Sequence, residues 1–148
     1  MGLIVLFLPY FPRSKHIHIF LAPLNLAFTN REEKGKLMEP TDSSSPGASS
    51  LDELPWKQVF DSYACIMCTR CHEVCPAHNS GTPLSPSALE INKRYFINQN
   101  AAGLVNGSTK LDLLQDAISE DAVWSCTTCM ACVEVCPVGN EPMQDILQ

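Results

Sequence analysis

The sequence predicts a mainly α-helical protein in which a helical insert separates two metal-binding loops and an apolar segment precedes them. Three observations lead to this prediction. Two cysteine runs of the same spacing, C-x2-C-x2-C-x3-C-P, occupy residues 65–76 and 126–137. The stretch between them carries helix-start signals. No stretch of the chain alternates apolar and polar residues for long enough to predict a strand.

Composition divides the 148 residues into three parts. Residues 1–28 are apolar and carry only two charged side chains, Arg13 and Lys15. Residues 29–54 are polar and end in a stretch rich in Ser, Pro and Gly, which predicts a flexible linker. Residues 55–148 contain all eight cysteines and are predicted to form the folded domain.

Two helices are predicted in the insert between the cysteine runs. The first begins at Ser85, a typical N-cap, with Pro86 at the first helical position. The second begins at Thr109, which forms a capping-box pattern with Asp112. The inward faces are predicted to carry Ala88, Ile91 and Tyr95 in the first helix and Leu111, Leu114 and Ile118 in the second. Another helix over 55–63 would lead into the first cysteine run.

Each cysteine run has the spacing that binds a [4Fe–4S] cubane. A cubane has four iron corners, and three cysteines spaced two apart can bind three of them from one short loop. The fourth cysteine points out of that loop, and in paired runs it binds the other cluster. The predicted ligands are Cys65, Cys68, Cys71 and Cys136 for cluster 1, and Cys126, Cys129, Cys132 and Cys75 for cluster 2.

Other chemistries fit these cysteines less well. Four disulfides need an oxidising compartment, and no secretory signal is recognisable. Zinc sites favour cysteine pairs separated by a longer loop, not three cysteines within seven residues. His72 and His78 lie beside the first run, but the cysteines fill every ligand position, so both are predicted to face solvent. The net charge of −6 excludes the basic surface that nucleic-acid binding requires.

Four stretches of the domain form a recognisable set: Tyr-Ala-Cys at 63–65, Pro-Leu-Ser-Pro at 83–86, Trp-Ser-Cys-Thr-Thr-Cys at 124–129 and Val-Gly-Asn-Glu at 138–141. With the cysteine runs, they make residues 56–146 resemble the iron–sulfur part of heterodisulfide reductase-related proteins. Related arrangements occur in glycolate oxidase iron–sulfur subunits and in succinate dehydrogenase. The expected fold is an alpha-helical ferredoxin-like dicluster domain with a helical insert between its two cluster-binding loops.

A second resemblance concerns the N-terminal part. Residues 12–20, Pro-Arg-Ser-Lys-His-Ile-His-Ile-Phe, with Pro23 after them, resemble the end of the membrane cytochrome b domain of nitrate reductase gamma-type subunits. In that family a histidine at the position of His18 is an axial haem ligand. The resemblance implies haem b only in a full-length parent protein, because the helix with the second ligand is missing here. The alternative is an interfacial histidine in a truncated helix.

Together the resemblances imply that the chain relays single electrons through its two clusters, between a membrane haem or quinone partner and a soluble redox subunit. No catalytic site is predicted, and no G-x-G-x-x-G pattern is present for a dinucleotide. The chain would be the electron-transfer part of an oxidoreductase, as a fragment or a shortened member of its family. The alternatives are a stand-alone soluble ferredoxin-like carrier, an iron–sulfur subunit of a glycolate oxidase- or succinate dehydrogenase-like complex, and clusters with a purely structural role.

The N-terminal part is expected to associate with a membrane as the end of a membrane domain. A helix over 16–28 would rise only about 20 Å, short of the roughly 30 Å hydrocarbon core, and Pro9, Pro12 and Pro23 are expected to break a longer span. The basic residues are expected on the cytoplasmic face by the positive-inside bias. They are Arg13, Lys15, Arg31, Lys34 and Lys36. The clusters would then lie at the cytoplasmic face of the cell membrane.

Overall fold

The computed structural model describes residues 2–29, 47–110 and 112–147. Over these residues the protein is mainly helical, as predicted, and a bridge between Ser50 and Asp112 is the only β-type pairing among them. The elements of the cysteine-rich part are, in chain order, η4 (Leu51–Glu53), α3 (Trp56–Ala64), α4 (Arg70–Glu73), α5 (Pro76–Asn79), α6 (Pro86–Val105), η5 (Leu113–Ala117), α7 (Glu120–Trp124), α8 (Ala131–Glu134) and α9 (Pro142–Leu147).

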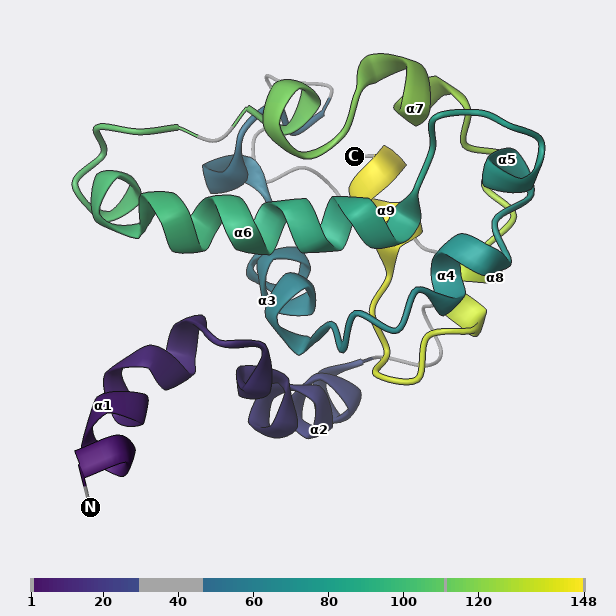
Figure 1. Cartoon of the computed structure of the whole chain (residues 1–148). Helices are drawn as coiled ribbons and strands as arrows, with labels where there is room; N and C mark the ends of the chain where they lie inside the picture. Colours follow the sequence, from purple (N-terminus) through teal and green to yellow (C-terminus); the bar gives the residue numbers. More distant parts are fainter. Residues whose placement is uncertain (1, 30–46, 111, 148) are drawn as a thin grey trace.

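Helix α6 is the centre of the domain (Figure 1). It begins where the sequence predicts, because the Ser85 side chain accepts a hydrogen bond from the Ala88 N–H and Pro86 takes the first position. It contacts α3, α4, α9 and η5. The helix before the first cysteine loop (α3), the helix that ends it (α4) and the helix after the second run (α9) are therefore packed against one long helix.

The predicted inward face of α6 is wrong at Tyr95, and its other two members, Ala88 and Ile91, are only half-buried. Tyr95 is 52% exposed, whereas Leu89, Glu90, Lys93 and Arg94 are buried. The prediction placed only apolar residues inside, but this helix buries charged side chains that have polar partners. A buried charge of this kind is tolerated because it is paired and hydrogen-bonded.

Lys93 lies at the centre of these buried charges. Its Nζ is 3.2 Å from Glu90 Oε2, pairs with Asp145 of α9, and donates to the Gln58 carbonyl of α3 at 3.0 Å. Burial alone would lower the pKa of Lys93, but the Asp145 and Glu90 carboxylates outweigh burial and raise it. Lys93 is therefore a buried cation that ties three helices together.

The second predicted helix of the insert is instead the five-residue π-helical turn η5. Asp112, not Thr109, caps it, because the N–H of Thr109 still bonds the Gly103 carbonyl at the end of α6. Leu113 is buried, whereas Leu114, predicted to face inward, is exposed. Ile118 packs against the core as predicted, and Leu111 lies outside the described residues.

Two apolar clusters form the core of the described structure. The larger one lies between α6, η5 and α9, and the smaller one lies beneath α8. Their largest buried members are Leu54, Leu84, Leu89, Leu113 and Ile146 in the first and Cys132, Val133 and Met143 in the second. Cys75 belongs to the larger cluster, so cysteines of both runs lie against apolar surface.

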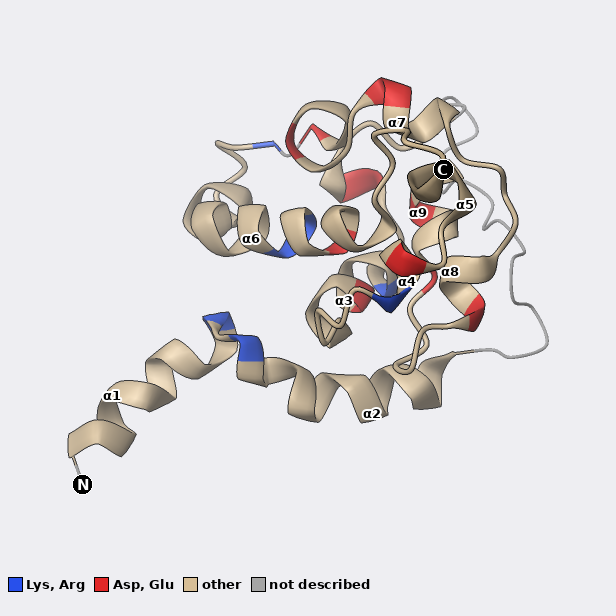
Figure 2. Ribbon diagram, turned by 45° about the vertical axis from the view of Figure 1, so that its right-hand side comes forward, with Lys and Arg blue, Asp and Glu red and all other residues tan. Residues whose placement is uncertain are grey.

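The N-terminal part forms α1 (Gly2–Tyr10), the 3-10 turns η1 (Phe11–Arg13) and η2 (Lys15–Ile17), and α2 (His18–Phe28). Helix α1 has no buried residue and extends away from the domain, whereas α2 packs along α3 (Figure 2). Pro12 lies in η1, where the helical path is interrupted between α1 and α2, whereas Pro9 and Pro23 lie inside those two helices. Of the helices in the described ranges, none has both the length and the apolar character to span a bilayer.

Part of the predicted linker is folded. Ser50 and Glu53 form a capping box around η4, and Leu54 packs into the larger apolar cluster. Residues 30–46 of the linker, with Arg31, Lys34 and Lys36, lie outside the described residues. The structured part of the chain therefore includes residues 47–54.

Replacing Lys93 by Met should destabilise the protein by about 3–5 kcal/mol, because it leaves the Glu90 and Asp145 carboxylates buried without their cation. Urea unfolding of the cluster-loaded protein measures this loss. The control is Lys110→Met, which removes an exposed pair with Asp52 at 3.9 Å and should cost less than about 1 kcal/mol. Equal losses in the two variants would show that the buried pairing does not stabilise the fold.

Candidate metal centres

The two cysteine loops have the same backbone conformation. Met67 and Thr69 of the first loop have positive φ values of 56° and 61°, and their equivalents Thr128 and Met130 have 54° and 63°. A short helix follows each loop, α4 in the first and α8 in the second, and the two helices contact each other. The sequence repeat is therefore also a structural repeat.

In each loop the backbone N–H of the first left-handed residue points at a cysteine sulfur. The Met67 N–H lies 3.4 Å from Cys65 Sγ. In the second loop the Thr128 N–H bonds the Cys126 sulfur in the same way. Concave arrays of N–H groups of this kind bind anions, including the thiolates and sulfides of iron–sulfur sites. The loops thus fit a negatively charged group.

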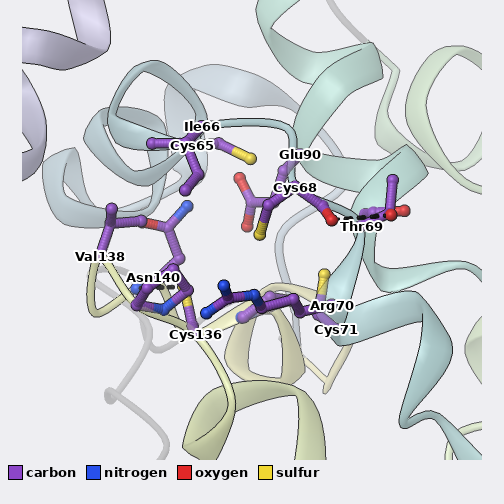
Figure 3. Close-up of a pocket in the computed structure, with 13 residues that line it drawn as sticks. Cys65, Ile66, Cys68, Thr69, Arg70, Cys71, Glu90, Cys136, Val138 and Asn140 are labelled. Atoms are coloured by element: carbon purple, nitrogen blue, oxygen red, sulfur yellow. Dashed lines mark hydrogen bonds between the residues drawn. The ribbon is translucent and has the colours of Figure 1, made fainter.

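Four cysteines line one pocket, Cys65, Cys68, Cys71 and Cys136 (Figure 3). The first three come from the first loop and the fourth comes from the second run. A cubane binds one sulfur at each of four corners, and this pocket offers four sulfurs from two directions. Its remaining wall includes the apolar side chains of Ile66 and Val138. The ligand set predicted for cluster 1 is therefore brought together in the fold.

The other four cysteines also lie near one another. Burial, together with the nearby Cys126, Cys129 and Cys75, raises the pKa of Cys132 to about 12. The pKa of Cys126 is raised by burial too, with added contributions from Cys75 and Cys129. Cys75 thus lies beside the second run, where the ligand set predicted for cluster 2 requires it.

The two sites are adjacent. Cys71, Cys126 and Cys132 pack in the same small apolar cluster. Burial, together with neighbouring thiols that include Cys132 of the other site, raises the pKa of Cys71 to about 12. Because ligating thiols must be deprotonated, loading iron at these sites releases protons and is favoured by higher pH.

The sequence pattern of the 4Fe-4S dicluster domain matches residues 61–140, more than half of the chain. The chain belongs to the 4Fe-4S dicluster domain family. It is an iron–sulfur protein of ferredoxin type, and the matched range holds both loops and the helical insert between them.

Three curated relatives are similar to this dicluster protein over most of its length. The probable iron-sulfur-binding oxidoreductase FadF of Bacillus subtilis is 32% identical over 95% of the chain. The EtfAB:quinone oxidoreductase of Syntrophomonas wolfei is 29% identical over 100%, and a probable membrane-anchored ferredoxin of Chromohalobacter salexigens is 29% identical over 88%. The chain spans about a quarter of the length of these relatives, 25%, 24% and 24% respectively. No solved structure matches it.

Two groups beside the first cysteine site of the dicluster domain were not predicted from the cysteine pattern. Glu90 lines the first pocket, and burial holds its pKa well above the ordinary range even though Lys93 lowers it. The Asn140 N–H lies 3.3 Å from Cys136 Sγ. Asn140 belongs to the Val-Gly-Asn-Glu stretch that the sequence analysis singled out, but the contact of its N–H with the Cys136 sulfur could not be predicted from that stretch. Glu90 was missed because a buried carboxylate leaves no periodic pattern.

The histidines lie apart from the cysteine pocket. His72 and His78, predicted to face solvent, are half-buried with ring centroids 3.5 Å apart, and His72 Nδ1 lies 2.8 Å from Ser85 Oγ. His18 Nδ1 donates a hydrogen bond to the Lys15 carbonyl at 2.5 Å, and in this tautomer the other ring nitrogen, Nε2, carries the lone pair. The haem role of His18 stays a prediction. Among the described residues, no three His, Cys, Asp or Glu side chains are close enough to hold a single metal ion.

The backbone of the second loop can be tested with two neighbouring threonines. Thr128 has a positive φ, which a β-branched residue adopts at a cost of about 1–2 kcal/mol, whereas Thr127 does not. Thr128→Gly removes that cost, while glycine's own entropy cost of roughly 0.5–1 kcal/mol acts in both variants. We expect Thr128→Gly to be about 1–2 kcal/mol more stable than Thr127→Gly in urea unfolding of the loaded protein. Equal stabilities would contradict the left-handed conformation.

Proposed function

We propose that this dicluster protein relays single electrons through two [4Fe–4S] clusters. Cluster 1 is held by Cys65, Cys68, Cys71 and Cys136, and cluster 2 by Cys126, Cys129, Cys132 and Cys75. The observation that carries the proposal is the pocket in which three cysteines of the first run meet one cysteine of the second. A [4Fe–4S] cluster, when bound, exchanges one electron at a potential set by its charge, exposure and hydrogen bonds.

The residues around the two sites suit electron transfer. Ile66 and Val138 give the first cysteine pocket an apolar wall, and backbone N–H groups point at Cys65, Cys126 and Cys136. The two sites share an apolar cluster, which places one ligand set against the other. An electron accepted at one cluster can therefore pass to the other inside the domain.

The proposed partners are a membrane haem or quinone on one side and a soluble redox subunit on the other, as in heterodisulfide reductase-like proteins. The relatives support this proposal, since one is named a quinone oxidoreductase and another a membrane-anchored ferredoxin. The exposed apolar helix α1 supports contact with a membrane surface, and the proposed side is the cytoplasmic face. Haem at His18 is proposed only for a longer protein that supplies a second ligand.

Iron analysis tests the number of clusters. After anaerobic preparation, iron and acid-labile sulfide should each approach about eight per chain, because two cubanes contain four of each. The measurement is a colorimetric assay of both elements, with free thiols counted on the same sample. About four irons per chain, with half of the cysteines free, would contradict two clusters.

Paired cysteine substitutions test which cysteine serves which cluster. Cys75→Ser combined with Cys129→Ser should leave about four irons per chain, because both changes fall on cluster 2. Cys75→Ser combined with Cys68→Ser should remove nearly all iron, because one change falls on each cluster. Iron content and electron paramagnetic resonance of the reduced proteins measure the outcome. The reverse pattern would show that each run closes its own cluster.

Vesicle flotation tests the membrane proposal. Wild-type protein should float with vesicles of phosphatidylethanolamine and phosphatidylglycerol, because α1 exposes apolar side chains along its whole length. Leu3→Lys with Leu6→Lys, at residues 84% and 72% exposed, should reduce flotation about tenfold or more, since charge opposes burial in lipid. Val105→Lys, at an equally exposed residue at the end of α6, is the control. Equal flotation of all three proteins would contradict a membrane role for α1.

A further inference from the structure

A buried asparagine connects the N-terminal helix α2 to the second cysteine run. Asn25 is fully buried. Its Nδ2 lies 2.7 Å from Asp61 Oδ1, 2.9 Å from Asn140 Oδ1 and 3.0 Å from the Val138 carbonyl. An amide group has two hydrogens, so one of them is shared between acceptors. Two of these three acceptors belong to the turn that follows Cys136.

The side chain of Asn140 is held by two hydrogen bonds, one with Asn25 and one with Asp61. Its side-chain Oδ1 accepts from Asn25, and its Nδ2 donates to the Asp61 carbonyl at 2.6 Å. With the side chain fixed at both ends, the backbone N–H of Asn140 points at Cys136 Sγ. A continuous path of hydrogen bonds therefore runs from α2 to the sulfur of a proposed cluster 1 ligand.

The end of α2 makes a second contact with the same turn. Thr29 Oγ1 lies 3.2 Å from the Gly139 carbonyl and donates to the Asn25 carbonyl at 2.8 Å. Gly139 has a φ of 72°, and a Cβ at that position would lie 2.7 Å from Thr29 Oγ1. Only glycine therefore permits both the turn and the close approach of α2.

Burying an asparagine at position 25 has a free-energy cost that an apolar side chain would not have. The Asn25 Oδ1 is buried and accepts no hydrogen bond from any residue in the described ranges. Leaving a buried polar atom unpaired costs about 1–3 kcal/mol, and an apolar side chain of similar size would avoid that cost. The three contacts of the amide nitrogen instead point to a role in holding the turn.

We propose that Asn25 is a positioning residue that sets the reduction potential of cluster 1 from the N-terminal segment. Asn25 fixes Asn140 so that its N–H donates to the Cys136 sulfur. Reduction adds negative charge to a cluster, and an N–H dipole aimed at a ligand sulfur stabilises that charge and raises the potential. This inference rests on the proposed function, in which Cys136 binds cluster 1.

The contacts of α2 also indicate which of the two proposed clusters lies next to the N-terminal segment. Helix α2 contacts the turn that follows Cys136, the fourth ligand of cluster 1, and among the described residues none of its hydrogen bonds reaches a cluster 2 cysteine. Displacement of α2 would weaken the hydrogen bond to Cys136 and leave the cluster 2 ligands in place. Cluster 1 is thus the cluster whose potential responds to whatever binds the N-terminal segment.

Two substitutions of Asn25 test the proposal in the cluster-loaded protein. Asn25→Leu removes the amide while filling its volume, and Asn25→Ala also removes the volume, so a shift common to both arises from the hydrogen bonds. At a fixed ambient potential, the ratio of reduced to oxidised cluster 1 should fall at least about threefold, or about 28 mV at 59 mV per decade. Cluster 2 should keep its potential. Spectroscopic redox titration measures both, and the paired cysteine variants assign the signals.

Two further measurements complete the test. Asn98→Leu is the matched control, because Asn98 Nδ2 also contacts the N-terminal segment, at the Arg13 carbonyl, while its Oδ1 accepts from Tyr63 of α3 and not from the turn after Cys136. It should leave both potentials unchanged. Hydrogen exchange at residues 138–141 should become faster in the Asn25 variants. Thr29→Val should produce the same changes to a smaller extent, which keeps the test decisive if the Asn25 variants do not fold.

Different results would overturn different claims. Variants that hold about eight irons and keep the wild-type potentials would overturn the role of Asn25 and leave the proposed function intact. Equal shifts in both clusters would also overturn it, because they would indicate general loosening of the domain. Wild-type protein that binds no cluster would overturn the proposed function and the inference together.

Discussion

The position of Lys93 is the constraint on which the rest of the domain depends. Its ammonium group meets the Gln58 carbonyl of α3, Glu90 of its own helix and Asp145 of α9. Helix α3 ends directly before the first cysteine loop, and α9 begins shortly after the second run. Because one buried cation fixes these helices against α6, it also fixes the distance between two loops that are far apart in sequence.

The centre of the domain is therefore held by buried ion pairs and hydrogen bonds rather than by a large apolar core. The buried members of the apolar clusters are aliphatic side chains, Met143 and cysteines, whereas the two largest fully buried side chains of the described structure are Arg94 and Lys93. Glu90 extends the buried charges to the wall of the first cysteine pocket. Fold stability and the electrostatic surroundings of the proposed cluster 1 therefore depend on the same few side chains, and a change that disturbs one will disturb the other.

The sequence was informative where structure is local and misleading where it depends on distant contacts. Cysteine spacing predicted loops that the fold brings together in crossed pairs, and Ser85 with Pro86 predicted the start of α6. Apolar periodicity misplaced the inward face of α6, because that face is charged, and it missed the π-helical turn, which a bond to the Ser49 carbonyl helps to position. Asn25 could not be found, since its partners lie up to 115 residues away.

The contacts of α2 also change how the N-terminal segment relates to the clusters. Composition separates the apolar residues 1–28 from the domain, yet Arg94 of α6 donates to the Ser14 carbonyl and Asn25 is buried against the turn after Cys136. Both ends of the segment from Ser14 to Thr29 are thus held by the domain. In a longer protein, a partner bound to α1 would therefore lie at a distance from the proposed cluster 1 that α2 determines.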